Sequence, residues 1–211
     1  MKLFELVAGL ASLGLSGGYY LWLVKQVRRN PMRTVIGQSG IRRDAWVRSV
    51  MAQRRDILAV QTLRNWTMAS SFLATTAILI ATGALHFLVS IPQQSDFLHQ
   101  LNFLGSTSST MVTMKLFIIV GALLVAFFNF AVAIRYYNHV SIEINVPESA
   151  EEQNAVSAVQ RMMDRGGLHY TVGMRCFYIV IPLSLWLFGP VWLLLGSAGL
   201  CVALFWMDRL D

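Results

Sequence analysis

The chain has 211 residues, of which 55% are hydrophobic and 13% are charged, and its formal net charge is +6. Soluble domains carry about 25% charged residues, so this composition excludes an ordinary soluble protein and predicts several membrane spans. The chain has 2 cysteines, Cys176 and Cys201, and its sequence contains no Cys/His spacing typical of zinc or iron–sulfur sites. We therefore expect no metal and no other cofactor.

The first apolar run, at about residues 4–24, has the length of a transmembrane helix. It is longer than the apolar part of a secretion signal, and it contains no convincingly placed cleavage site, so we expect a retained span. Within it, Ala8, Ser12 and Ser16 follow one another at intervals of four residues and share one helix face. We expect this face of small residues to pack closely against a neighbouring helix.

A strongly basic segment follows the first apolar run. Residues 25–66 contain ten lysines and arginines against two acidic residues, Asp44 and Asp56. Apolar residues recur at helical spacing around Trp46 and Val50, with arginines on the other side. We therefore expect a basic amphipathic helix on the inner membrane surface, leading towards the second span. Membrane topology and attraction to anionic lipids account for this charge, so we expect no nucleic-acid partner.

The second apolar run, at about residues 67–90, carries polar residues along one side. Gln61, Arg64 and Asn65 lie within one turn just before it, and the same side of a helix continues through hydroxyl residues to His86. Polar groups inside a membrane usually face protein. We therefore expect this side to face the bundle interior or an oligomer interface, and Gln61, Arg64 and Asn65 to point into protein.

The third apolar run, at about residues 113–134, carries small residues and Asn129 on one side. Small side chains allow close approach, so we expect a neighbouring helix to give Asn129 a hydrogen-bonding partner. A second cytoplasmic helix is expected near residues 148–165, because acidic residues in its first turns suit the helix dipole. The sequence RGG at residues 165–167 is typical of a helix end, and we expect the helix to stop there.

The last apolar run, at about residues 176–207, is longer than one span requires. Pro182 and Pro190 can kink a helix, whereas two spans here would have only about 12–16 residues each, so we expect one bent helix. The expected fold is therefore all-α: a single membrane domain over residues 1–211, built as a four-helix bundle with amphipathic cytoplasmic helices. Lysine and arginine gather in the first and third connections, which places both termini outside the bacterial inner membrane.

Arginines near the cytoplasmic ends of the spans are the candidates for a binding site. Arg64, with Gln61 and Asn65 beside it, and Arg135 and Arg175 are placed to hold the phosphate or carboxylate of a lipid or another anion. The alternative is that these side chains only extend to the headgroups. Polar residues within the spans are expected to serve helix packing, namely Asn129, His86, Ser12 and Ser16. The sequence contains no catalytic motif that would identify an active site.

Three stretches of the sequence resemble a known family: ILAVQTLRNWTMASSFLATTAI at residues 57–78, FNFAVAIRYYNH at 128–139 and GMRCFYIVIPLSLWLFGP at 173–190. They are similar to bacterial and plant membrane proteins grouped as domain of unknown function 599, and the similarity runs from about residue 5 to the end. The resemblance implies a small integral membrane protein with several spans. It transfers no catalytic residue.

Together these features favour a non-enzymatic inner-membrane protein: a structural or assembly component that acts as a homo-oligomer or as a subunit of a membrane complex, in contact with membrane lipids. Two alternatives stay open. One is a channel or transporter for a small solute or ion, and the other is an enzyme that handles a lipid or a quinone. A channel needs the polar side of the second span around a watery cavity, and an enzyme needs a pocket with a titratable group beside Arg64.

Overall fold

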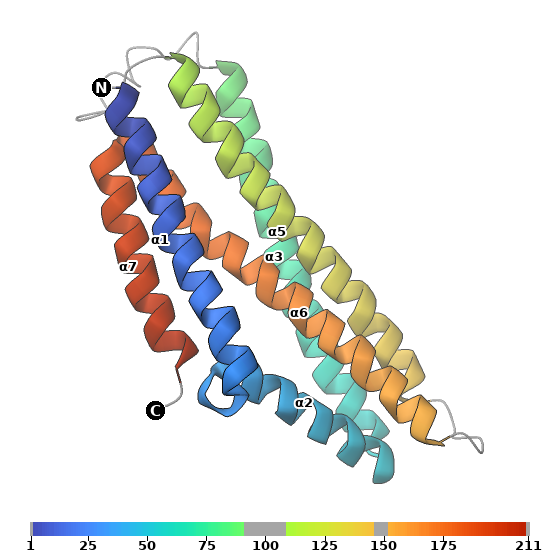
Figure 1. The fold of residues 1–211 in the computed structure, drawn as a ribbon. Coiled ribbons are helices and arrows are strands. Elements are labelled where there is room, and N and C mark those ends of the chain that lie inside the picture. Colours follow the sequence, from blue (N-terminus) through green and yellow to red (C-terminus); the bar gives the residue numbers. More distant parts are fainter. Residues whose placement is uncertain (1, 91–108, 146–151, 210–211) are drawn as a thin grey trace.

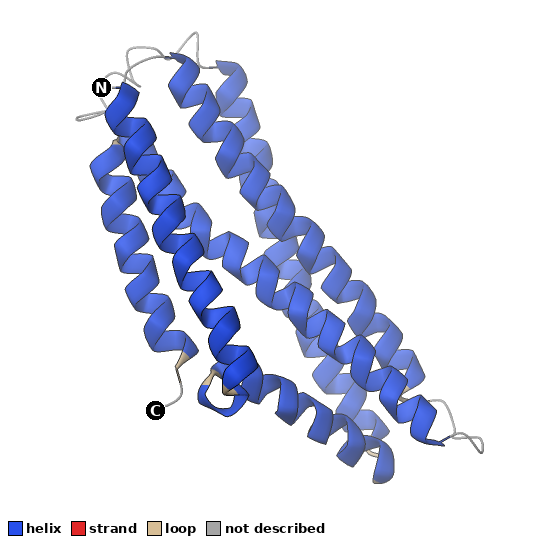
Figure 2. Cartoon of the chain, viewed as in Figure 1, coloured by secondary structure: helices blue, strands red, loops and turns tan. Residues whose placement is uncertain are grey.

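The structure, a computed structural model, describes residues 2–90, 109–145 and 152–209 (Figure 1). Within these ranges the chain is almost entirely helical and contains no β-strand (Figure 2), which confirms the all-α prediction. The α-helices are α1 (Lys2–Arg29), α2 (Val35–Ala52), α3 (Asp56–Ser90), α5 (Ser109–Glu143), α6 (Glu152–Leu185) and α7 (Pro190–Asp208). Two short 3₁₀ helices join them, η1 (Pro31–Arg33) and η3 (Trp186–Phe188).

Among the described residues, five helices are long and apolar enough to cross a membrane. They are Glu5–Arg29, Asp56–Val89, Thr110–Glu143, Ala155–Phe188 and Pro190–Asp208. Helices suit this environment because they satisfy their own backbone hydrogen bonds where water is absent. The fold is thus that of a multi-pass membrane protein, with five candidate spans in place of the expected four.

The additional span arises in the last apolar run, where the prediction of one bent helix is wrong. Helix α6 ends at Leu185, and α7 begins at Pro190 and runs back towards the end of the bundle from which α6 came (Figure 1). Gly189 between them has a φ of 141°, which a residue with a Cβ rarely adopts. Pro190 occupies the first position of α7, where a missing N–H costs nothing. This glycine–proline pair therefore reverses the chain, and Pro182 lies inside α6.

Two glycines expected to end a helix lie inside α6 instead. A Cβ on Gly166 would lie 2.8 Å from Cε1 of Tyr137 on α5, and one on Gly167 would lie 2.8 Å from Cζ of Arg43 on α2. The absence of side chains thus lets α6 pack closely against both helices. Since the helix continues through these glycines, its apolar part begins well before residue 176 and is long enough for a span.

The basic amphipathic helix predicted before the second span corresponds to α2. Its first turn is capped by Thr34, whose Oγ1 accepts a hydrogen bond of 3.2 Å from the backbone N–H of Gly37. The apolar side of α2 packs against protein, because Val47, Val50 and Met51 are buried in a cluster with residues of α3, α5 and α6. This burial fixes α2 against the bundle.

The first residues of α1 and the last residues of α7 lie at opposite ends of the bundle (Figure 1). The α1–α2 connection, the start of α6 and the C-terminus of α7 lie at one end of the bundle (Figure 1). We call this end the basic end, because it includes the connection rich in lysine and arginine. The expectation that both termini lie outside depends on an even number of spans and does not fit five. The cytoplasmic helix expected near residues 148–165 is the first part of α6 from Glu152 onwards, and residues 148–151 lie outside the described residues.

A buried ion pair lies at the other end of the bundle, where α6 turns into α7. The side chain of Lys115 on α5 is 0% exposed, and its Nζ donates to Oε1 of Glu5 on α1 at 3.3 Å. The same ammonium donates to the backbone carbonyl of Trp186 at 3.2 Å and lies 5.3 Å from the centroid of the Trp186 ring. A buried charge is tolerated only with such partners, so the pair holds α1, α5 and η3 together.

The five-helix fold predicts that the two ends of the chain lie on opposite sides of the membrane. Protease-cleavable tags joined before Met1 and after Asp211 should be cut from opposite faces of sealed vesicles, because an odd number of crossings separates the ends. Cleavage of both tags from the same face would contradict five spans.

Removing one partner of the buried ion pair should lower the free energy of unfolding more than removing both partners. Lys115→Met leaves the Glu5 carboxylate buried without its ammonium, so we expect the free energy of unfolding to fall by about 3–5 kcal/mol. Combining Lys115→Met with Glu5→Gln should recover most of that loss. Thermal unfolding in detergent measures both, with the exposed Arg54→Met as a control. A double variant less stable than Lys115→Met alone would contradict this account.

Candidate functional site

The polar side of α3 faces away from the single chain. Gln61, Arg64 and Asn65 are exposed, whereas Leu63 on the other side of the helix is 1% exposed. The expectation that these three polar residues point into protein is therefore wrong for one chain. The side that packs against α5 is instead a row of small residues, Ala74, Ala77 and Ala81. Alanines at this spacing allow the closest approach of two helices, and this decides which side of α3 is buried.

Five hydroxyl groups along α3 are satisfied within the helix itself. Each donates to the carbonyl four residues earlier, at 2.7–2.9 Å, in Thr62, Ser70, Ser71, Thr76 and Thr82. A hydroxyl bonded in this way leaves no unsatisfied donor when it faces apolar surroundings. The polar side of α3 can therefore lie on the outer surface of the chain, where His86 is exposed as well.

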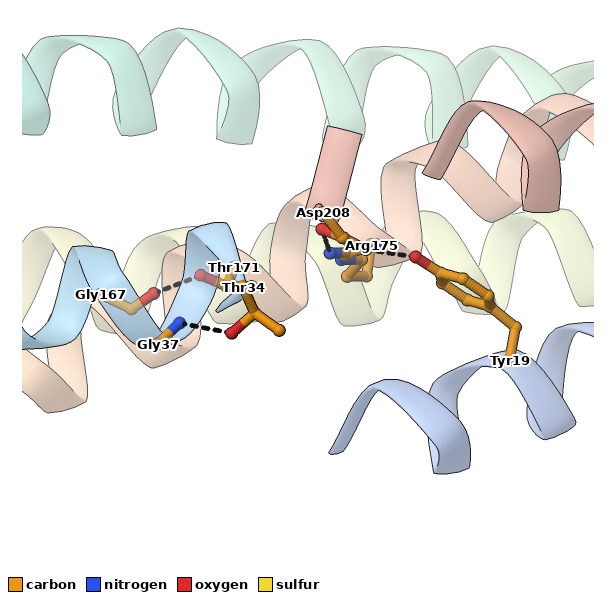
Figure 3. A network of polar contacts seen from close by, with 7 residues as sticks. All are labelled: Tyr19, Thr34, Gly37, Gly167, Thr171, Arg175 and Asp208. Atoms are coloured by element: carbon orange, nitrogen blue, oxygen red, sulfur yellow. Dashed lines mark hydrogen bonds and ion pairs between the residues drawn. The ribbon is translucent and has the colours of Figure 1, made fainter. Parts of the chain in front are cut away.

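Arg175 belongs to a network that joins three helices near the basic end (Figure 3). Its guanidinium pairs with Oδ1 of Asp208, the last residue of α7, and the two side chains are 14% and 8% exposed. Tyr19 of α1 donates its hydroxyl to Oδ2 of the same carboxylate at 2.6 Å. The guanidinium carbon also lies 5.8 Å from the ring centroid of Tyr20. The network therefore ties α1, α6 and α7 together.

This network assigns Arg175 to a protein carboxylate rather than to a lipid. A guanidinium paired with a carboxylate is among the stronger polar contacts in proteins, and burial strengthens the need for the pairing. The sequence pointed to Arg175 but not to Asp208, which lies 33 positions later and returns only because the chain reverses at Gly189. Arg135, the other arginine proposed for an anion site, is exposed on α5.

The polar residues expected to serve helix packing take different positions. Ser12 is buried on α1, and its hydroxyl lies 2.6 Å from that of Ser197 on α7. Oδ1 of Asn129 on α5 lies 2.9 Å from Nδ1 of His169 on α6. These two contacts each join a pair of helices within the spans. The other two residues are Ser16, which is half-buried on α1, and His86, which is exposed on α3.

Two large cavities lie at the basic end. One of about 950 Å³ lies between α2, α3, α5 and α6, and one of about 790 Å³ lies between α1, η1, α2 and α7. None of the residues proposed from the sequence as an anion site lines either cavity: Gln61, Arg64, Asn65, Arg135 and Arg175. Asp44 lies on α2 beside the larger cavity, and burial, together with the nearby carboxylate of Asp164, raises its pKa.

The arginines in the wall of the larger cavity are Arg42, Arg43 and Arg165. The sequence showed Arg42 and Arg43 only as part of the basic loop. Their shared location depends on α2 folding back against α6, which no local pattern in the sequence indicates.

Comparison with known proteins identifies the family. A family model described as "Protein of unknown function, DUF599" matches residues 7–211. The chain belongs to this family. The match confirms the resemblance seen in three stretches of the sequence, and it includes residues of all five candidate spans of this DUF599 protein. No curated protein and no solved structure matches the chain.

The two arginines Arg175 and Arg64 should differ in their effect on stability. Arg175→Ala leaves the Asp208 carboxylate buried without its counter-charge, so we expect a loss of about 3–5 kcal/mol in the free energy of unfolding. Arg64→Ala removes an exposed cation and should change it by no more than about 0.5 kcal/mol. Thermal unfolding of the purified variants in detergent measures both. Equal effects of the two substitutions would contradict this assignment.

Proposed function

We propose that this DUF599 protein is a non-enzymatic component of the bacterial inner membrane that works as a homo-oligomer or as a subunit of a larger membrane assembly. The outward polar side of α3 carries the proposal. Thr75, Thr82 and His86 are exposed there on a helix apolar enough to span the membrane. Polar residues at this depth usually face protein, so contact with another membrane subunit accounts for them.

The orientation follows from the distribution of positive charge. Residues 25–66 contain ten lysines and arginines, and residues 91–112 contain none. Short loops rich in lysine and arginine stay in the cytoplasm. We therefore place the basic end in the cytoplasm, with the start of α1 outside and the end of α7 inside.

The same side of α3 weighs against the two alternative functions. A solute path within one chain needs polar groups that face inward, whereas Thr75 and Thr82 face outward. An enzyme acting beside Arg64 needs a concave pocket there, and Arg64 lies outside the walls of both large cavities. Assembly through α3 requires neither feature.

Crosslinking between chains tests the proposal. In a cysteine-free background, Thr75→Cys and Thr82→Cys should each form disulfide-linked complexes in native membranes, because the polar side of α3 meets another subunit. Leu13→Cys on α1 and Val202→Cys on α7 are controls on other exposed surfaces and should remain unlinked. Native mass measurement in mild detergent then gives the number of subunits. A lone chain in that measurement, with no crosslink at Thr75 or Thr82, would overturn the proposal.

A further inference from the structure

The larger cavity at the basic end is separate from the outward side of α3. Its volume of about 950 Å³ falls within the range of ligand sites, roughly 300–1,000 Å³. Aromatic residues from four helices contribute to its wall, namely Trp46, Trp66, Tyr137 and Tyr170. Most of the wall is apolar, as expected for a site that holds an apolar ligand group.

Contacts between α2 and α6 lie beside the cavity. Nε2 of Gln160 on α6 donates to the backbone carbonyl of Asp44 on α2 at 3.1 Å. Arg43 of α2 lies against Gly167 of α6, whose missing side chain leaves room for the guanidinium. On the α3 side, the rings of Trp46 and Trp66 lie 6.2 Å apart. These contacts surround the space without filling it.

The charged groups in the wall favour an anion. They comprise Arg42, Arg43 and Arg165 against one carboxylate, that of Asp164. Arg43 and Asp164 form a long contact of 3.4 Å, and Nε of Arg43 is buried with no hydrogen-bond partner among the described residues. Arg42 and Arg165 are exposed and pair with no carboxylate in the described part of the chain. Guanidinium groups with unused hydrogen-bond donors are well suited to bind a phosphate.

The depth of the cavity matches the boundary between lipid headgroups and acyl chains. We take the end of α3 at Ser90 as the outer boundary of the hydrocarbon core, and about 20 residues then place the inner boundary near Ser70. Two wall residues, Trp66 and Ala69, stand close to that level. Tryptophan and tyrosine are enriched at this depth of a membrane. Trp66 is therefore at the depth where headgroups and acyl chains meet, and the three arginines belong to the same cavity wall.

We propose that this cavity binds one anionic phospholipid from the cytoplasmic leaflet. The phosphate binds Arg42, Arg43 and Arg165, and an acyl chain lies along the aromatic wall beside Trp66. The excess of arginine over carboxylate selects a headgroup with net negative charge, and the apolar wall selects a lipid over a free anion. The leaflet follows from the orientation proposed above, whereas the site itself does not depend on assembly through α3.

Native mass spectrometry of the full chain in a neutral detergent measures the binding. The three probes are phosphatidylglycerol, phosphatidylcholine and inorganic phosphate. We expect one phosphatidylglycerol per chain, bound about tenfold more tightly than phosphatidylcholine, because arginine attracts the net charge of the former. Inorganic phosphate at the same concentration should not bind, because it cannot use the apolar wall.

Charge variants test the arginine contacts. Arg42→Gln combined with Arg165→Gln should weaken phosphatidylglycerol binding about tenfold. Both residues are exposed, so the fold should persist. Arg54→Gln combined with Arg55→Gln makes the same change in charge outside the cavity wall and should leave the affinity unchanged.

A volume variant tests the apolar wall. Ala69→Trp should fill part of the cavity and abolish lipid binding. The control is Met68→Trp, which adds the same ring at the neighbouring position, exposed and outside the cavity wall, and should leave lipid binding unchanged. Binding that survives both Ala69→Trp and the loss of Arg42 and Arg165 would overturn the proposal.

Two other results would also overturn it. Equal affinity for phosphatidylglycerol and phosphatidylcholine would show that the arginines do not select lipids by the net charge of the headgroup. Binding of inorganic phosphate that depends on Arg42 and Arg165 would assign the cavity to a small anion. Crosslinks at Thr75 and Thr82 measure assembly separately from lipid binding. If the crosslinks form but phosphatidylglycerol does not bind the unaltered cavity, the lipid site is contradicted and the proposed assembly is not.

Discussion

The buried ion pair of Lys115 and Glu5 stabilises the chain reversal on which the second half of the bundle depends. Where α6 stops, backbone carbonyls lose their helical partners at a place where water is scarce. The carbonyl of Trp186 receives the N–H of Gly189 at 3.1 Å and the Lys115 ammonium at 3.2 Å. Glu5 supplies the opposite charge. This carbonyl of the turn is therefore satisfied without water.

This reversal brings α7 back along α1 and α6, and polar contacts between these helices then follow. The hydroxyls of Ser12 and Ser197 meet within the α1–α7 contact, and Asp208 reaches Arg175 near the basic end. The backbone next to Asp208 also pairs with the residue that caps α2, because Arg209 forms an isolated β-bridge with Thr34. The position of α2, and with it the cavity between α2, α3 and α6, is thus linked to the turn at the opposite end.

The orientation of α3 shows how packing and polarity compete in a membrane. A polar side would be expected to turn inward, yet the alanine side lies against α5 and the hydroxyl side lies outward. Packing prevails because hydroxyls such as that of Thr82 already bond to their own helix, which lowers the free-energy cost of facing outward. The outward side thereby remains for a neighbouring subunit, while the cavity on the other side of Trp66 remains for a lipid.

The sequence by itself determined the family, the all-helical membrane class, the first three apolar helices and the basic end. The family is recognised from three stretches of the sequence, and the other properties depend on hydropathy and charge summed over many neighbouring residues. It did not determine the break before Pro190, because a proline fits a kink or a helix start equally well. Likewise, Gly166 and Gly167 indicate a helix end unless Tyr137 and Arg43 lie against them.

Only the tertiary structure decided which polar residues meet. Arg175 and Asp208, or Glu5 and Lys115, lie on separate helices, and no periodicity within one helix relates them. Their pairing depends on where each helix ends and which side it buries. Those choices follow from close contacts between backbones, such as that of Ala77 on α3 with α5, and sequence pattern along one segment does not contain them.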